Sequence, residues 1–226
     1  MSAIAATLTP RARSTRAARV KVEPLGRTDY LACWRSMQDF TDAREDVTPD
    51  EIWLTEHDPI YTLGLAGRRD HVRAPGGIAV LKVDRGGQVT YHGPGQVVAY
   101  TLVDLRRRGL GIRAFVRLLE GAVIAWLAAH RIDAYGKVDA PGVYVQSQGR
   151  EAKIAALGLK VRRGCTYHGV AVNIDMDLGP FDGIDPCGYP GLAVTQLADF
   201  GVRRSVETAG MELAAHLRAA LDPAAA

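Results

Sequence analysis

The chain has 226 residues, of which 47% are apolar and 23% are charged, and its formal net charge at pH 7 is +3. A chain of this length and apolar content can bury a full core, and we expect most of it to form one domain. No apolar run approaches the length that spans a bilayer, so we expect no membrane association. The three cysteines are widely spaced and odd in number, which indicates a reducing compartment with free thiols.

The positive charge is concentrated at the N-terminus. Residues 1–22 contain five basic residues and no acidic residue, so the rest of the chain is close to neutral. Residues 1–19, rich in Ala, Ser, Thr and Arg, are expected to be a disordered basic tail, and residues 20–226 a single domain. A mitochondrial transit peptide is the alternative interpretation of the tail, whereas the compartment we favour is the cytoplasm.

Two short basic clusters lie in the body of the chain, at Arg68-Arg69 and at Arg106-Arg107-Arg108. They lack interleaved aromatic residues, so no nucleic-acid-binding face is expected. The ordinary interpretation of such clusters is a solvated loop. A second hypothesis is that they, with Arg73, meet an acidic protein partner through charge complementarity.

Hydrophobic periodicity predicts three helices separated by short strands. The first helix follows a cap at Thr28, the second lies within residues 114–132, and the third covers about 206–221. Strands are predicted at residues 52–56, 60–63, 78–83, 97–103, 143–145, 154–159 and 170–174, with a hairpin turn at 147–150. Hairpins interspersed with helices predict an α+β fold that has a mixed or antiparallel sheet and flanking helices.

The segment Arg85–Gln96 is the densest local signal, because four glycines, an arginine and a histidine stand between two apolar runs. Glycine allows backbone N–H groups to approach a ligand closely. A simple hairpin turn explains the same residues equally well. The segment alone leaves both interpretations open.

Cys187 lies in Pro186-Cys187-Gly188, between further proline and glycine residues. A constrained turn of this kind favours an exposed, reactive thiol over a buried cysteine that serves packing. Cys33 lies within a helical pattern and is assigned to packing. Cys165 has a histidine three residues later, but no compact set of further ligands accompanies it, so no metal site is expected.

A cysteine nucleophile needs activation, because only a few per cent of an ordinary thiol is ionised at neutral pH. Lys153, His92 and His168 are the candidates. Lys153 begins an otherwise apolar strand, where a lysine that reaches out to solvent is the ordinary interpretation. If its ammonium instead lies beside the sulfur, it lowers the pKa of the thiol.

Six sequence blocks occur together and in order along the body of the chain. Together they closely resemble the lipoyl(octanoyl) transferase family, although each block alone would be a weak signal. The blocks are Glu56-His57-Asp58-Pro59-Ile60-Tyr61-Thr62-Leu63-Gly64, Arg85 to Gln96, Gly142-Val143-Tyr144-Val145, Lys153-Ile154-Ala155-Ala156-Leu157-Gly158, His168-Gly169 with Asn173, and Pro186-Cys187-Gly188.

This resemblance implies a fold shared with lipoate–protein ligases and biotin–protein ligases. It implies an acyltransferase that moves an octanoyl group from octanoyl-acyl carrier protein to a lysine of a lipoyl domain, without a cofactor. The acceptors it implies are E2 subunits of 2-oxo-acid dehydrogenases and the H protein of the glycine cleavage system. Cys187 would carry the acyl group as a thioester, and Lys153 would act as its acid–base partner.

The resemblance also implies an acyl pocket. Its lining would comprise Arg85, Gly86, Gly87, Gln88, Val89, Thr90, Tyr91, His92, Ala156, Leu157, Gly158, His168, Gly169, Val170 and Ala171. Two other functions are alternatives to this one. An ATP-dependent ligase of the lipoate or biotin type would need no Cys187 turn, and a noncatalytic binding module would leave both Cys187 and Lys153 without a purpose.

Overall fold

The structure is a computed structural model that describes residues 19–185 and 191–222. Eight strands of this part form one mixed sheet in the order β1-β2-β6-β10-β9-β8-β7, with β11 pairing along β9. The bounds of these strands are β1 Lys21–Thr28, β2 Glu51–His57, β6 Gln96–Leu102, β7 Ala134–Gly136, β8 Gly142–Ser147, β9 Arg150–Arg162, β10 Cys165–Asn173 and β11 Ala193–Val194. Most neighbours pair antiparallel, whereas β1 pairs with β2 and β11 pairs with β9 in parallel.

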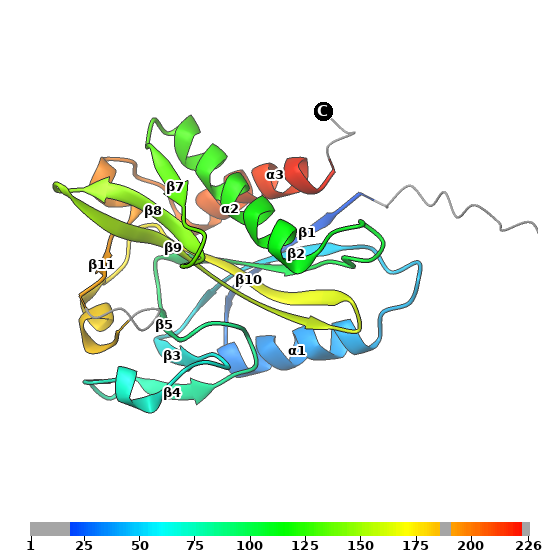
Figure 1. Ribbon diagram of the computed structural model, residues 1–226, viewed down its shortest axis with the longest axis horizontal. Helices are drawn as coiled ribbons and strands as arrows, with labels where there is room; N and C mark the ends of the chain where they lie inside the picture. The colour runs from blue at the N-terminus through cyan, green and yellow to red at the C-terminus, as the bar shows by residue number, and fades with distance from the viewer. Residues whose placement is uncertain (1–18, 186–190, 223–226) are drawn as a thin grey trace, which may run out of the picture.

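Helices cover both faces of this sheet, as Figure 1 shows. Helices α2 and α3 lie together on one face, and α1 lies on the other. Their bounds are α1 Tyr30–Asp42, α2 Ile112–Ala129 and α3 Val206–Leu221. The larger apolar core lies beneath α2 and α3 and includes Trp126, Ile154 and Leu213. A smaller core lies beneath α1, so the predicted α+β fold with a mixed sheet and flanking helices is confirmed.

A second, three-stranded sheet stands beside α1, in the order β4-β3-β5. Its strands are β3 Ile60–Leu63, β4 Ala79–Lys82 and β5 Val89–His92, and short 3-10 helices lie at η1 Arg69–His71, η2 Gly179–Gly183 and η4 Leu197–Phe200. The hairpin interpretation of Arg85–Gln96 is therefore wrong. The strand before this segment pairs with β3 in the small sheet, and the strand after it, β6, belongs to the main sheet. The segment itself contains β5, so it links two sheets.

The ends of the predicted helices agree with the structure to within a few residues. The cap of α1 is Asp29, whose carboxylate accepts a hydrogen bond from the Ala32 N–H at 2.8 Å, and not the neighbouring Thr28. Ser205 caps α3 in the same way, accepting from the Thr208 N–H at 3.1 Å. Side-chain oxygens at these positions satisfy backbone donors that the first helical turn leaves unpaired.

One of the two basic clusters is structural. The side chains of Arg107 and Arg108 are 13% and 6% exposed, and both lie 2.6 Å from the carboxylate of Asp50. Arg44 reaches the same carboxylate at 2.6 Å. The solvated-loop interpretation is therefore wrong for Arg107 and Arg108, because this ion cluster buries them. For Arg68, Arg69 and Arg73 the hypothesis of an acidic partner stays a prediction.

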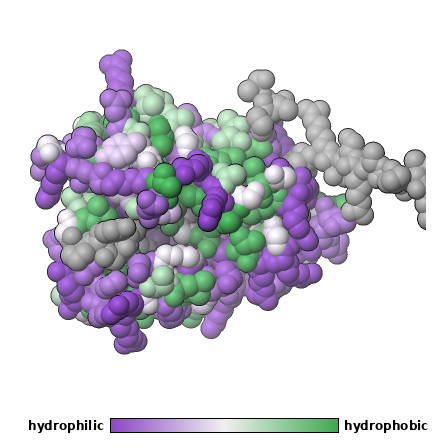
Figure 2. All heavy atoms as spheres, viewed as in Figure 1, coloured by the Kyte–Doolittle hydropathy of each residue, from purple (hydrophilic) through white to green (hydrophobic). Residues whose placement is uncertain are grey.

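The face seen in Figure 2 carries hydrophobic residues toward its middle and mostly hydrophilic residues around its outline. Within residues 19–185 and 191–222, no helix has the length and apolar character needed to cross a bilayer.

Candidate functional site

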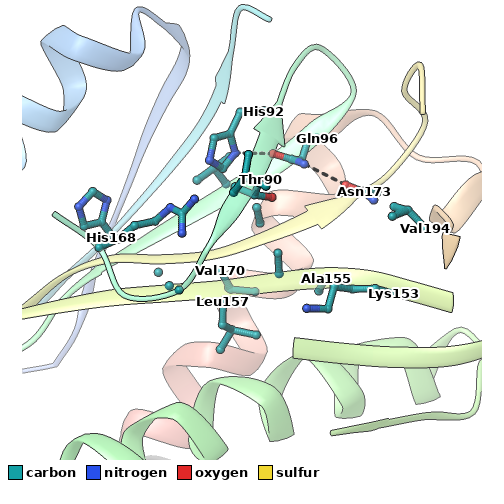
Figure 3. Close-up of a pocket in the computed structure, with 18 of the residues that line it drawn as sticks. Thr90, His92, Gln96, Lys153, Ala155, Leu157, His168, Val170, Asn173 and Val194 are labelled. Carbon is teal, nitrogen blue, oxygen red and sulfur yellow. Dashed lines mark hydrogen bonds between the residues drawn. The ribbon is translucent and has the colours of Figure 1, made fainter. Parts of the chain in front are cut away.

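A pocket lies where the segment between β4 and β5 meets strands β9 and β10. The space inside it measures about 750 Å³, open solvent at its mouth included. Figure 3 shows Lys153 and Val194 toward one end of the set of side chains and His168 toward the other. The lining is predominantly apolar, and it comprises Tyr30, Arg85, Gly87, Gln88, Val89, Thr90, His92, Gln96, Val98, Tyr100, Lys153, Ile154, Ala155, Ala156, Leu157, Gly158, His168, Gly169, Val170, Ala171, Asn173, Phe181 and Val194.

Arg85 fixes the loop that forms one wall of this pocket. Its guanidinium is buried and donates to the backbone oxygen of Thr62 at 2.7 Å and to the hydroxyl oxygen of the same residue at 2.9 Å. The next residue, Gly86, donates its N–H to the carbonyl oxygen of Leu159 at 2.8 Å. The loop is thus tied to β3 on one side and to β9 on the other.

Glycine is needed where this loop crosses the sheet. A Cβ atom at Gly158 would lie 2.9 Å from Cδ of Arg85, and one at Gly169 would lie 2.0 Å from the carbonyl oxygen of Ala99. Gly158 and Gly169 face each other across β9 and β10. A side chain at either position would displace the backbone or the buried arginine. Glycine at both positions therefore allows Arg85 and the backbone of Ala99 to lie in close contact with β9 and β10.

His168 holds an unusual backbone conformation beside this glycine pair. Its φ angle is 61°, in the left-handed region that a non-glycine residue adopts at a cost of about 1–2 kcal/mol. Its ring Nε2 lies 2.9 Å from a carboxylate oxygen of Asp84. Because that oxygen can only accept when the carboxyl is ionised, Nε2 carries a proton.

Asp84, at the start of the glycine-rich loop, gathers donors from two other elements. Its carboxylate accepts from Nε1 of Trp34 in α1 at 2.9 Å and from the hydroxyl group of Tyr167 in β10. Burial acts to raise the pKa of Asp84, but hydrogen bonds from His168, Tyr167 and Trp34 outweigh it and hold the pKa well below the ordinary value. The same burial lowers the pKa of His168, against the effect of Asp84. Asp84 therefore anchors the pocket wall as an ionised group.

A chain of buried hydrogen bonds crosses the pocket from β5 to the segment before η4. Gln96 donates from Nε2 to Oδ1 of Asn173 at 2.9 Å, and its Oε1 lies 2.7 Å from Nδ1 of His92. Asn173 in turn donates to the carbonyl oxygen of Thr195 at 3.0 Å. Gln96 Oε1 can only accept, so Nδ1 of His92 carries the proton. Burial lowers the pKa of His92 to about 3, and the imidazole is neutral at physiological pH.

Lys153 lies in β9 and is 4% exposed. Its ammonium nitrogen donates to the carbonyl oxygen of Pro141 at 3.3 Å and lies 5.0 Å from the ring centroid of Tyr144. The register between β8 and β9 shifts at this point, so that Tyr144 is paired with Lys153 and Val143 with Ala155. A β-bulge of this kind turns the side chains beside it toward a new direction.

The second residue of the predicted dyad, Cys187, lies outside the described residues, as do Pro186 and Gly188. The chain on the far side of this gap returns to Lys153. Val194 in β11 pairs with Lys153, and the N–H of Thr195 donates to the Lys153 carbonyl oxygen at 3.0 Å. The described chain after residue 190 thus reaches Lys153 at the end of the pocket where this lysine lies.

Most of the residues predicted for the acyl pocket lie together. Lys153 and all the predicted lining residues except Gly86 and Tyr91 line the same pocket. Gly86 faces Leu159 through its hydrogen bond, and Tyr91 packs in the small sheet against Phe181, with 5.5 Å between the ring centroids.

The sequence interpretation did not assign nine of the lining residues to the pocket, namely Tyr30, Gln96, Val98, Tyr100, Ile154, Ala155, Asn173, Phe181 and Val194. Gln96 and Asn173 carried a local signal, since both lie within the sequence blocks described above. Phe181 and Val194 carried none, because their place depends on the path of the chain around residues 184–194. Among the described residues, no group of three or more His, Cys, Asp or Glu side chains could hold a metal ion.

Comparison with protein-family models matches residues 29–218 to the lipoyl protein ligase A/B catalytic domain. Two similar relatives carry the name octanoyltransferase. The protein from Thiobacillus denitrificans is 59% identical over 196 residues, covering 83% of this chain and 88% of the relative. The protein from Alkalilimnicola ehrlichii is 54% identical over 197 residues, covering 87% of this chain and 90% of the relative.

Solved structures share the fold at much lower identity. The bipartite lipoate protein ligase of Thermoplasma acidophilum has a TM-score of 0.71 and 17% identity, covering 90% of this chain and 84% of that one. The biotin protein ligase of Aquifex aeolicus, in complex with biotin and ATP, has a TM-score of 0.56 and 12% identity, covering 89% and 70%. At these identities the likeness concerns the fold, and it confirms the predicted relation to lipoate and biotin ligase catalytic domains.

Proposed function

Because the chain belongs to the octanoyltransferase family of lipoate biosynthesis, we propose that it moves an octanoyl group from the thioester of octanoyl-acyl carrier protein to a lysine of a lipoyl domain. The chain is thus an acyltransferase. The finer parts of the proposal are the donor, the acceptor, a covalent intermediate on Cys187 and an acid–base role for Lys153.

One observation carries these finer parts. The side chain of Lys153 is buried in the lining of an apolar pocket, and its strand pairs with the segment that follows Cys187. An apolar slot suits a saturated acyl chain, since each buried CH₂ group contributes about 0.8 kcal/mol. Arg85, the other cation of the lining, is bound to the backbone oxygen and the hydroxyl group of Thr62. A lysine among apolar lining residues suits a reacting group better than a binding contact for such a chain.

In the first step the sulfur of Cys187 attacks the thioester carbonyl of the donor. A new C–S bond forms, the bond to the donor sulfur breaks, and the donor leaves as a thiol with the proton that Cys187 gave up. One thioester replaces another, so the step needs no ATP. Dividing the transfer into two easier steps is the general advantage of a covalent intermediate.

In the second step the amino group of the acceptor lysine attacks the Cys187 thioester. An amide bond forms, the C–S bond breaks, and the sulfur of Cys187 takes a proton again. Amide formation from a thioester is energetically downhill, which drives the sequence forward. Both steps require a proton to leave a nucleophile and another to reach a leaving group.

Lys153 is suited to those proton transfers. As an ammonium it stabilises the thiolate of Cys187, and as an amine it accepts the proton that each nucleophile loses. The carbonyl oxygen of Pro141 at 3.3 Å and the Tyr144 ring at 5.0 Å hold the side chain in its place in the pocket lining.

The proposed acceptors are lipoyl domains of E2 subunits of 2-oxo-acid dehydrogenases and the H protein of glycine cleavage. We place the reaction in the cytoplasm, in the single catalytic domain of residues 20–226, because a reactive thiol needs a reducing compartment.

The test is an intact-mass measurement after the protein is mixed with octanoyl-acyl carrier protein in the absence of ATP. The proposal expects a single octanoyl adduct that is absent in Cys187→Ser. Lys153→Ala should slow formation and discharge of the adduct by about 100-fold or more, the scale of general acid–base catalysis. An adduct that persists in Cys187→Ser, or transfer that depends on ATP, would contradict the proposal and favour a ligase.

A further inference from the structure

Glu120 is a buried carboxylate in the apolar stripe of α2. It is 3% exposed, and it lies on the same face of the helix as Val123 and Leu127, both fully buried. An isolated carboxylate in such a place is costly, and an apolar residue of similar size would ordinarily be more stable there. The side chain nevertheless faces inward, and it has a specific partner.

That partner is the backbone at the start of β8. Oε1 of Glu120 accepts a hydrogen bond from the N–H of Gly142 at 2.9 Å, and both groups are buried. The second carboxylate oxygen leaves little room at Gly136 in β7, where a Cβ atom would lie 3.1 Å away from it. Glu120 therefore ties α2 to the turn between β7 and β8.

This turn lies directly against Lys153. A Cβ atom at Gly142 would lie 2.8 Å from Cε and 3.0 Å from Nζ of Lys153, and the φ angle of Gly142 is 147°. The residue before it, Pro141, supplies the carbonyl oxygen that accepts from the Lys153 ammonium at 3.3 Å. The residue that Glu120 holds and the residue that contacts Lys153 are thus consecutive in the chain.

We infer that Glu120 is a positioning residue for Lys153, which acts by holding the 141–142 backbone against the lysine side chain. The inference rests on the proposed role of Lys153 in acyl transfer. A group that moves protons must be held within a fraction of an ångström of its working position, and displacement by about 1 Å can cost about 100-fold in rate. Glu120 touches neither the acyl chain nor the sulfur in this account.

The carboxylate oxygen, and not the negative charge, is the feature that the Gly142 N–H requires. Glu120→Gln keeps the length and the accepting oxygen, whereas Glu120→Ala removes both. We expect kcat to fall about 10- to 100-fold in Glu120→Ala with KM for the octanoyl donor changed less than about twofold. Glu120→Gln should keep most of the wild-type kcat.

A control variant and a double variant distinguish a positioning role of Glu120 from a merely structural one. Val123→Ala, one turn along the same buried face, should lower Tm without lowering the kcat of the folded protein. If Glu120 acts through Lys153, adding Glu120→Ala to Lys153→Ala should slow the residual reaction no further, because the two effects are coupled.

The outcomes distinguish this inference from the proposed function. If Lys153→Ala is inactive while Glu120→Ala lowers Tm alone, or if the two variants are additive in rate, the positioning role is wrong and the proposed function stands. If Lys153→Ala retains full activity, the proposed role of the lysine fails and the inference about Glu120 fails with it. Loss of kcat in Glu120→Ala, its recovery in Glu120→Gln and non-additivity with Lys153→Ala together support it.

Discussion

Removing the carboxylate of Asp84 should loosen the wall of the acyl pocket. Asp84 accepts hydrogen bonds from Trp34, Tyr167 and His168, which belong to α1 and β10, and it directly precedes Arg85 in the loop. In Asp84→Ala all three donors lose their acceptor. In Asp84→Asn the side chain keeps its size and one accepting oxygen and loses its charge.

The size of the effect follows from the contacts and their exposure. A buried donor left without a partner costs about 1–3 kcal/mol. The carboxylate is 25% exposed, so water can replace part of each contact and the lower end applies. We expect a loss of roughly 3–4 kcal/mol for Asp84→Ala and about 1 kcal/mol for Asp84→Asn. In a chain of this size the larger loss corresponds to a fall in Tm of about 10 °C.

The difference in stability between wild type and Asp84→Ala should also depend on pH. The pKa of Asp84 is held below its ordinary value in the folded protein, so its contribution is fully present above the unfolded pKa of about 3.9 and is lost as the pH falls through the folded value. Thermal melts of wild type and Asp84→Ala should therefore differ by a constant amount from pH 7 to about pH 5. The two curves should converge below about pH 4.

The assay has a matched control in Asp70→Ala. Asp70 also pairs with an arginine, Arg68, but both side chains are more than half exposed, so no measurable change in Tm is expected. KM for the octanoyl donor should rise in Asp84→Ala and remain unchanged in Asp70→Ala. Equal melting of Asp84→Ala and wild type at pH 7, or a difference that persists undiminished at pH 3, would refute the reasoning.

Two further substitutions and one titration test other parts of the structure. Gly142→Ala should lower kcat, because the added Cβ atom would lie 2.8 Å from Cε of Lys153. Steady-state rates check this, with Gly121→Ala as the control, because a Cβ atom added there has no neighbouring atom within 4 Å outside the backbone of its own helix. Asp50→Asn should destabilise the fold by about 3–5 kcal/mol, measured by denaturant unfolding, because it leaves buried arginines without their carboxylate. The imidazole of His92 should stay neutral down to about pH 3 in an NMR titration. The free energy of unfolding should fall as the pH drops below about 6.5, because His92 then binds a proton in the unfolded chain but not in the folded one. A His92 titration near pH 6.5 would show that burial does not lower the pKa of this imidazole, and would contradict the prediction.

Elements with a strong periodic pattern could be predicted from the sequence. The third helix has the predicted bounds, and β3 was predicted to the residue, because local propensity and burial agree in these segments. The strands β1, β5, β7 and β11 were not predicted. Strands β5, β7 and β11 contain two to four residues each and depend on distant partners, so the local pattern carries no signal for them. Strand β1 is longer, but it is mostly exposed and lacks an apolar pattern.

The sequence indicates which residue types take part in the chemistry of the site, but it does not indicate which of them contact one another. Lys153 stood out because it interrupts an apolar run, and the structure places it in the pocket lining. Glu120 attracts no notice as a functional residue in the sequence, although its spacing of three from Val123 and seven from Leu127 puts it on the buried face of the helix. Its partner Gly142 lies 22 residues away in the chain, and only the fold brings the two together.

Charge pattern was the least reliable guide. Arg107 and Arg108 belong to a run of three basic residues that suggests a solvated loop, yet Asp50 draws both into a buried cluster. Single sequence positions cannot reveal such pairings, because Asp50 lies more than fifty residues earlier, just before β2.

The central claim is that the octanoyl group passes through a thioester on Cys187 before it reaches the acceptor. The direct measurement is to isolate the octanoylated protein free of donor, add an apo lipoyl domain, and follow the intact masses of both proteins with time. The account predicts that the octanoyl mass leaves the enzyme and appears on the domain at a rate at least equal to kcat. An adduct that stays on the enzyme, while fresh donor octanoylates the domain at the full rate, would contradict it.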